Sequence, residues 1–194
     1  MRKILIIGAG RSASSLIKYL LDKSEAEKLL LTIADLSEDL AQKKTGNHKN
    51  ACAISFDVCN ETQRKQEIQQ ADIVISMLPA HLHIEVAKDC ILYKKNMITA
   101  SYISEEMKSL DFQAKESQIV LMNEIGLDPG IDHMSAMKIM DEIKSKGGKI
   151  ILFESFCGGL VAPESDTNLW NYKFSWNPRN VVLAGQGGAA KFIQ

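Results

Sequence analysis

The feature that most constrains the fold is a glycine-rich turn directly after an apolar run near the N-terminus. The run Ile4–Ile7 leads into residues 8–13, which read GAGRSA and fit the pattern G-x-G-x-x-A. In a strand–turn–helix unit, Gly8 allows a tight turn, Gly10 lets backbone approach a pyrophosphate, and Ala13 keeps the helix close to the strand. We therefore expect a dinucleotide to bind at this turn, with contacts from Gly8, Gly10, Arg11, Ser12 and Ala13.

Short apolar runs alternate with helical patterns beyond this turn. Strands are expected over 3–7, 29–34, 51–56, 72–76, 96–100 and 118–122, and helices over 12–23, 38–44, 61–70, 82–93 and 105–117. Continuous Ile, Leu and Val runs are typical of strands that are buried on both faces. The alternation predicts an α/β fold with a doubly wound parallel (Rossmann) sheet.

The texture of the chain changes after this alternation. Asp128-Pro129-Gly130 opens an expected helix over 131–145, and an expected strand follows over 149–155. We expect a Rossmann domain over 1–125 and, over 126–194, the start of a second α+β domain for substrate binding and dimerisation. A last strand expected over 189–194 has no partner after it, so we expect the chain to be a fragment of a longer protein.

Composition excludes several classes of function. The net charge of −1 offers no electrostatic attraction to nucleic acid or to an anionic membrane. No apolar run approaches the roughly 20 residues that span a bilayer. The four cysteines match no zinc-ligand spacing and no Cys-x-x-Cys pair. We therefore expect a cytoplasmic protein with reduced thiols and no metal.

Two aspartates end expected strands on the cofactor side. Asp35 could accept hydrogen bonds from both ribose hydroxyls of NAD, and it would repel a 2′-phosphate. It therefore slightly favours NAD within an NAD(P) assignment, although Ser37 and nearby lysines could offset this, and a helix cap or turn residue is the alternative. Asp57 could reach the adenine amino group, or it is a solvated turn aspartate.

The fourth expected strand ends in a further candidate segment, Ser76-Met77-Leu78. Ligands bind at the carboxyl ends of strands in such sheets, so Ser76 is a candidate for the cofactor site. Met77 and Leu78 could form an apolar wall for the nicotinamide, and core packing is the alternative. His81 and His83 follow closely, but their spacing does not indicate a metal site.

Three longer segments resemble the saccharopine dehydrogenase family in its L-glutamate-forming (saccharopine reductase) branch. They are GLDPGIDHM over 126–134, SFCGGL over 155–160 and NYKFSWNPR over 171–179. These strings are long and unusual, and they occur in the order found in the family. Members of the family are longer than this chain, and much of their substrate domain would be missing here.

The resemblance implies an NAD(P)-dependent oxidoreductase of lysine metabolism with a small amino-acid substrate. The family interconverts saccharopine, NAD(P)⁺ and water with L-glutamate and 2-aminoadipate 6-semialdehyde. Two alternatives stay open. One is a related enzyme that acts on another secondary amine, such as a carboxynorspermidine dehydrogenase. The other is a non-catalytic NAD-binding redox sensor. A homodimer is possible, and the chain alone is expected to be inactive.

The resemblance also implies that Tyr102, Asp128 and Cys157 line the catalytic site. Asp128 could orient water or a proton carrier, and a helix cap is its alternative. Tyr102 could instead be a core aromatic residue. Cys157 would shape the site rather than transfer protons, and a small buried filler is its alternative.

A third group of candidates lies close to the end of the chain. Lys173 and Arg179 could bind substrate carboxylates beside Trp176, since a bidentate arginine suits that role. The alternative is a set of surface cations beside a packed tryptophan.

Overall fold

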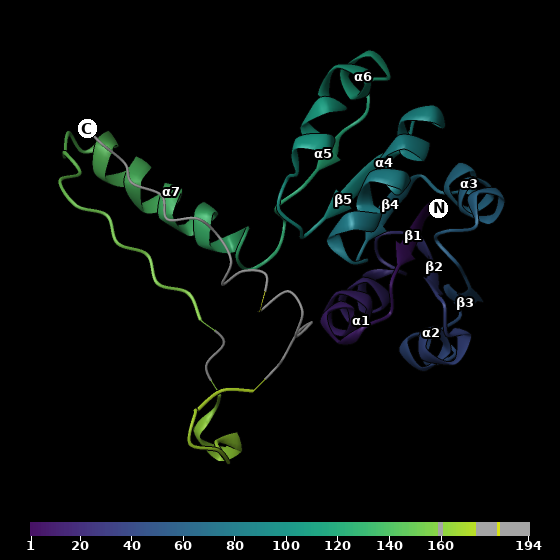
Figure 1. The fold of residues 1–194 in the computed structure, drawn as a ribbon, viewed down its shortest axis with the longest axis horizontal. Helices are drawn as coiled ribbons and strands as arrows, with labels where there is room; N and C mark the ends of the chain where they lie inside the picture. Colours follow the sequence, from purple (N-terminus) through teal and green to yellow (C-terminus); the bar gives the residue numbers. More distant parts are fainter. Residues whose placement is uncertain (159–160, 174–181, 183–194) are drawn as a thin grey trace. The chain divides into compact units, whose positions relative to one another are not determined.

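The computed structural model describes residues 1–158, 161–173 and 182. Six parallel strands form one sheet in the first part of the chain (Figure 1). They are β1 (Arg2–Ile7), β2 (Leu29–Asp35), β3 (Ala51–Ser55), β4 (Ile73–Ser76), β5 (Asn96–Thr99) and β6 (Leu121–Met122). The spatial order is β3-β2-β1-β4-β5-β6, the order of a classic dinucleotide-binding sheet, and it confirms the predicted Rossmann architecture.

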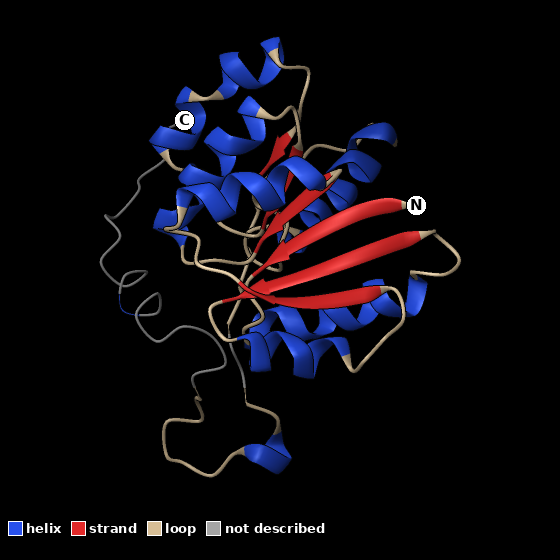
Figure 2. Cartoon of the chain, turned by 90° about the vertical axis from the view of Figure 1, so that its right-hand side faces the viewer, coloured by secondary structure: helices blue, strands red, loops and turns tan. Residues whose placement is uncertain are grey.

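Helices cover both faces of this sheet (Figure 2). They are α1 (Ser14–Lys23), α2 (Glu38–Thr45), α3 (Glu61–Gln70), α4 (His83–Leu92), α5 (Glu105–Ser109) and α6 (Asp111–Glu116). The last helix, α7 (Ile131–Ser145), buries none of its residues. Short 3₁₀ turns cover Arg11–Ala13, Ala80–Leu82 and Pro163–Ser165. Ser37, Asn60 and Ser104 cap α2, α3 and α5, because each side chain accepts a hydrogen bond from a first-turn backbone N–H.

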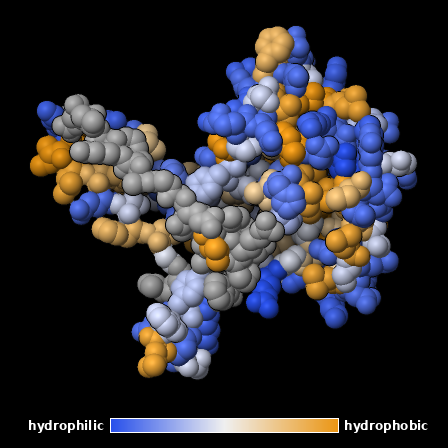
Figure 3. Space-filling model, in the orientation of Figure 1, coloured by the Kyte–Doolittle hydropathy of each residue, from blue (hydrophilic) through white to orange (hydrophobic). Residues whose placement is uncertain are grey.

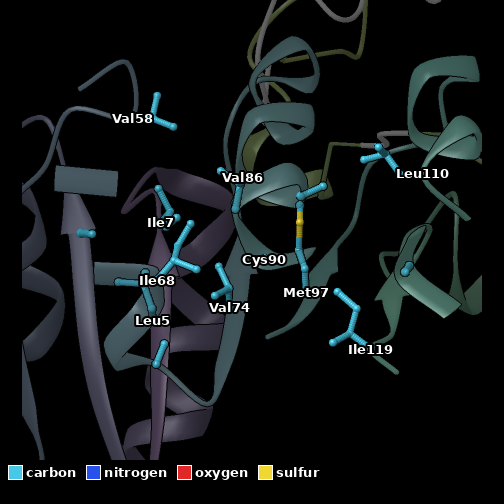
Figure 4. Close-up of a cluster of buried hydrophobic side chains, with 14 of the residues drawn as sticks. Leu5, Ile7, Val58, Ile68, Val74, Val86, Cys90, Met97, Leu110 and Ile119 are labelled. Carbon is cyan, nitrogen blue, oxygen red and sulfur yellow. The ribbon is translucent and has the colours of Figure 1, made fainter. Parts of the chain in front are cut away.

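Successive side chains of β1 point to opposite faces and build two separate cores. Ile4 and Ile6 pack with Ile17 of α1 and Ala41 of α2. The other core contains Leu5, Ile7, Val58, Ile68, Val74, Val86, Cys90, Met97, Leu110 and Ile119, among others, which Figure 4 labels. The continuous apolar runs predicted a sheet that is buried on both faces. The structure confirms this, because each face of β1 contributes to a separate core.

One expected helix is divided, and one expected strand does not form. The helix expected over 105–117 is interrupted at Leu110, where α5 ends and α6 begins. Residues 149–155 are not a strand, and Ile151 is 91% exposed. An extended segment becomes a strand only by pairing its backbone with a neighbour, and no described strand pairs with these residues. The expected strand over 189–194 lies outside the described residues.

The chain divides into two units, Met1–Phe153 and Glu154–Gln194, and each is considered by itself. In the second unit, the described residues contain one short element, the 3₁₀ turn over Pro163–Ser165. Among the residues that the structure describes, no helix is long and apolar enough to cross a membrane.

Candidate functional site

The glycine turn lies at the carboxyl end of β1, between the ends of β2 and β4. Gly8 has φ +107°, and its backbone N–H donates to Ala34 O at 2.7 Å. A Cβ at this position would lie 2.8 Å from Met77 O. Gly8 is therefore required both by its backbone conformation and by the close approach of the segment after β4. Sheets of this order bind their ligands in the crevice where the strand order reverses, between β1 and β4.

Gly10 lies in the same turn but meets a different constraint. A Cβ built on Gly10 would have no heavy atom within 4 Å, so the space in front of it is open. Arg11 and Ser12 are exposed in the 3₁₀ turn that precedes α1, whereas Ala13 is completely buried. The turn thus offers an open approach to backbone at a helix start, which fits a pyrophosphate group.

Asp35 ends β2 and joins this turn by its side chain. Its Oδ2 accepts a hydrogen bond from the backbone N–H of Ala9 at 2.7 Å. Its Oδ1 accepts one from the backbone N–H of Ser37 at 3.0 Å. The carboxylate is partly buried, and both of its oxygens are held beside the glycine turn. The cap of α2 is Ser37 rather than Asp35.

Asp57 follows β3 and is exposed. Its Oδ1 accepts from the backbone N–H of Cys59 at 2.9 Å, which is the pattern of an Asx turn. This contact is that of the solvated turn aspartate, and the predicted contact with adenine stays a prediction.

Ser76, Met77 and Leu78 end and follow β4. The Ser76 side chain is completely buried, and its Oγ lies 2.8 Å from Nδ1 of His83. Its hydroxyl therefore positions His83, and the predicted role of Ser76 in the cofactor site stays a prediction. Met77 and Leu78 are half-buried and pack against opposite cores, so core packing accounts for part of both side chains.

His83 is the site residue that sequence reasoning passed over. Its Nε2 lies 2.7 Å from Ser101 Oγ and 3.3 Å from Thr99 Oγ1, so one imidazole joins the ends of β4 and β5. Burial lowers the pKa of His83 to about 4, with a smaller contribution from His81. The ring is thus neutral at physiological pH. Its partners Thr99 and Ser101 lie 16 and 18 residues further along the chain, so no local sequence pattern indicates these contacts.

Tyr102 and Asp128 come together, as the resemblance implied. The Tyr102 hydroxyl donates to Asp128 Oδ1 at 2.9 Å, although 26 residues separate them in the chain. The Tyr102 side chain is 65% exposed, so it is not a core aromatic residue. The hydrogen bond to Asp128 raises the pKa of Tyr102, and burial adds to this.

Tyr102 and His83 both line a cavity of about 230 Å³. It is lined by Ala80, His81, His83, Ile84, Tyr102, Ser104, Glu106, Met107 and Asn123. Most of these residues belong to the segments that come after β4 and β5, and Tyr102 is one member of the Tyr102–Asp128 pair. A substrate beside the nicotinamide would lie at this edge of the sheet.

A second glycine turn presents Asp128. The backbone N–H of Gly126 donates to Pro129 O at 2.9 Å, and that of Ile131 donates to Gly126 O at 2.9 Å. Gly130 has φ +150°, and its backbone N–H donates to Asp132 Oδ1 at 2.8 Å. No side chain among the described residues caps the first turn of α7, so Asp128 is not its cap, and the Asp128 side chain bonds Tyr102 instead.

The remaining candidates lie in the second unit or outside the described residues. Cys157 and Lys173 are both exposed there, and their predicted roles at the catalytic and substrate sites stay predictions. Trp176 and Arg179 lie outside the described residues. Within the described part of the chain, no three His, Cys, Asp or Glu side chains are grouped as metal ligands.

The sheet order, the crevice beside β1 and the open glycine turn together define a dinucleotide-binding Rossmann domain. Comparison with known proteins identifies the family. The saccharopine dehydrogenase NADP binding domain matches residues 4–122, and the saccharopine dehydrogenase C-terminal domain matches residues 126–194. The chain belongs to the saccharopine dehydrogenase family.

Individual relatives agree with this assignment. The chain is 40% identical over 189 residues to a saccharopine dehydrogenase [NADP(+), L-glutamate-forming] of Pyricularia oryzae. The aligned region covers 97% of this chain and 41% of the relative. It is 36% identical to an alpha-aminoadipic semialdehyde synthase of Arabidopsis thaliana, over 96% of this chain and 19% of that protein. The chain thus spans about two fifths of the fungal relative's length.

A solved structure has the same fold. The apo L-Glu-forming saccharopine dehydrogenase of Saccharomyces cerevisiae superposes with a TM-score of 0.85 at 38% identity, over 95% of this chain and 40% of that one. These comparisons confirm the NAD(P) assignment at the level of the family. The name of the Pyricularia oryzae relative and that of the matching cofactor domain specify NADP, so they lend no support to the slight preference for NAD that we based on Asp35.

Proposed function

We propose that this chain forms the cofactor site and part of the catalytic site of an NAD(P)-dependent oxidoreductase that acts on saccharopine. The reaction converts saccharopine, NAD(P)⁺ and water to L-glutamate and 2-aminoadipate 6-semialdehyde. The observation that carries the proposal is the Tyr102–Asp128 hydrogen bond of 2.9 Å, because it joins two residues that the resemblance assigns to the catalytic site.

The first part of the reaction requires a fixed cofactor. A bound nicotinamide coenzyme would accept hydride from the carbon beside the secondary amine and leave an imine on the substrate. The open turn at Gly10 would hold its pyrophosphate, and the end of β2 its ribose. Binding both molecules in a fixed relative orientation lowers the translational and rotational entropy cost of the hydride transfer.

The second part of the reaction moves protons. The amine must lose a proton before oxidation, and water must lose one when it adds to the imine. Tyr102 stays protonated, because Asp128 accepts a hydrogen bond from its hydroxyl and thereby raises the pKa of Tyr102. Among the described residues none donates a hydrogen bond to Asp128 Oδ2, and Asp128 is exposed, so this oxygen is open to water or to the substrate amine.

The experiment is saccharopine-dependent reduction of NAD⁺ and NADP⁺ by the protein in its natural length. Asp128→Asn should lower kcat by about 100-fold, the effect typical of a lost proton-transfer group, without changing the melting temperature. The matched control is Asp111→Asn, which removes an exposed ion pair with Lys115 and should leave kcat unchanged. No turnover with either coenzyme, or unchanged kcat in Asp128→Asn, would contradict the proposal.

We also propose that the protein acts in the cytoplasm. The support is the state of three cysteines: Cys52, Cys59 and Cys90 are not joined in disulfides. Reduced thiols are typical of a compartment that is kept reducing by glutathione and thioredoxin. Fractionation of the native cells, with the protein in the cytosolic fraction, is the expected result, and an organellar location would contradict it.

A further inference from the structure

The end of β2 determines which dinucleotide a Rossmann domain can take. NAD has a free ribose 2′-hydroxyl at this place, and NADP has a 2′-phosphate. A carboxylate here accepts a hydrogen bond from the hydroxyl, whereas an arginine nearby accommodates the phosphate. In this chain the segment from the end of β2 into α2 is Asp35-Leu36-Ser37-Glu38-Asp39.

The Asp35 carboxylate is fixed at the position where a ribose would lie. Ala9 N–H donates to Oδ2 at 2.7 Å and Ser37 N–H donates to Oδ1 at 3.0 Å. Each carboxylate oxygen can accept two hydrogen bonds, so each keeps one acceptor position after these contacts. Two remaining acceptors match the two hydroxyls of an unphosphorylated ribose.

The charges around this position disfavour a phosphate. Residues 29–42 contain no lysine or arginine, while Glu38 and Asp39 add two carboxylates in the first turn of α2. Leu36, which directly follows Asp35, is apolar and 72% exposed. A 2′-phosphate carries up to two negative charges and would lie against a carboxylate that is partly withdrawn from water.

The cations of the glycine turn and of α2 lie outside residues 35–39. Lys43 and Lys44 are in the last turn of α2, which is about 12 Å long at 1.5 Å per residue. Lys44 Nζ donates to Ser14 Oγ at 2.5 Å, at the start of α1. Arg11 follows Gly10 in the turn that receives the pyrophosphate. None of these cations belongs to the segment that follows β2.

We propose that this chain binds NAD(H) in preference to NADP(H), and that Asp35 determines the preference. The chain would then differ in coenzyme from the relatives whose names specify NADP. The proposal rests on the dinucleotide site alone and does not require that saccharopine be the substrate.

The experiment titrates the 194-residue chain with NADH and with NADPH and follows nicotinamide fluorescence. NADH should bind at least about tenfold more tightly, because the ribose hydrogen bonds to a carboxylate are replaced by repulsion in NADPH. Leu36→Arg keeps Asp35 and its two backbone bonds, and it should narrow the difference. Asp35→Ser combined with Leu36→Arg should reverse the preference.

A matched control separates recognition from stability. Asp72 also accepts a backbone N–H of β1, since its Oδ2 lies 2.7 Å from Lys3 N, but it lies at the opposite end of the strand. Asp72→Asn should leave the ratio of NADH to NADPH affinity unchanged. The proposal is overturned if the unmodified chain binds NADPH as tightly as NADH, if it binds neither, or if the double variant keeps the original ratio.

The outcomes also separate this proposal from the proposed function. Saccharopine turnover with NADP⁺ but not NAD⁺ would uphold the enzyme and overturn the preference. Tight, selective NADH binding without saccharopine turnover would uphold the preference and contradict the enzyme.

Discussion

Two glycine turns present the two halves of the candidate site, and they are supported very differently. Each turn leads into a helix and needs a glycine at positive φ, Gly8 at +107° and Gly130 at +150°. The helix after the first turn, α1, buries Ile17 and Leu21 against the sheet. The helix after the second turn, α7, buries none of its residues.

The difference is visible on the surface. Five apolar side chains of α7 are exposed: Ile131, Met134, Met137, Ile139 and Ile143. Apolar side chains appear in orange where α7 lies in Figure 3. Most helical stability in proteins comes from packing of an apolar face rather than from the helix itself. The cofactor turn is therefore held by a packed core, while the Asp128 turn is held mainly by its own backbone bonds and by Tyr102.

Amide hydrogen exchange tests the difference in packing between α1 and α7 most directly. Amides of α1 and β1 should exchange only on global unfolding, which for a domain requires roughly 5 kcal/mol or more. Amides of α7 should exchange far faster, because opening this helix exposes no buried side chain. Equal protection of α1 and α7, measured by mass spectrometry on the 194-residue chain, would show that α7 is packed as well as α1.

Substitution of each positive-φ glycine by alanine measures how much each turn contributes to the free energy of unfolding. Gly8→Ala should lower the free energy of unfolding by about 3 kcal/mol or more, because the new Cβ meets the Met77 carbonyl as well as an unfavourable φ. Gly130→Ala meets Gly126 backbone and should distort its own turn, with a much smaller effect on global unfolding. Urea denaturation measures both values, and a larger effect for Gly130→Ala would reverse our interpretation.

Acid should weaken the packed region through His83. Its pKa is about 4 in the folded protein against an ordinary value of 6.5, so the unfolded chain binds the proton more readily. The stability contribution is therefore complete above pH 6.5 and is lost as the pH falls from 6.5 to 4, by up to about 3 kcal/mol. Urea denaturation at several pH values measures this loss.

A histidine variant separates this effect from general acid sensitivity. His83→Asn carries no titrating ring and should flatten the pH dependence in that window. His133→Asn is the control, because His133 is exposed and should leave the dependence unchanged. The same acid loss in His83→Asn would assign the effect to other groups.

The sequence predicted most of the backbone because local patterns determine it. The strand before the glycine turn and the helix over Ile131–Ser145 follow from apolar periodicity, a glycine turn and flanking breakers. Residues 149–155 share the apolar pattern of a strand, but pairing is a contact with another segment, and no local pattern reports it.

The site was predicted in part, for the same physical reason. The motif residues Tyr102 and Asp128 meet as expected, and the backbone at Gly8 and Gly10 behaves as the pattern requires. The hydrogen bonds of His83 to Ser76, Ser101 and Thr99 were not predicted, because they join separate elements of the fold. The contact of Asp35 with Ala9 N–H likewise crosses from β2 to the turn after β1, so its fixed carboxylate could not be deduced from spacing.

The central claim, that the first glycine turn holds a nicotinamide dinucleotide, is tested most directly by NADH binding to Gly10→Val and to the unmodified chain. A Cβ at position 10 has no heavy atom of the protein within 4 Å, and the side chain would extend into the open space where the pyrophosphate would lie. We predict an unchanged melting temperature and a loss of NADH affinity of about 100-fold or more, because several phosphate hydrogen bonds are blocked together. Equal NADH affinity in the two proteins would contradict the account.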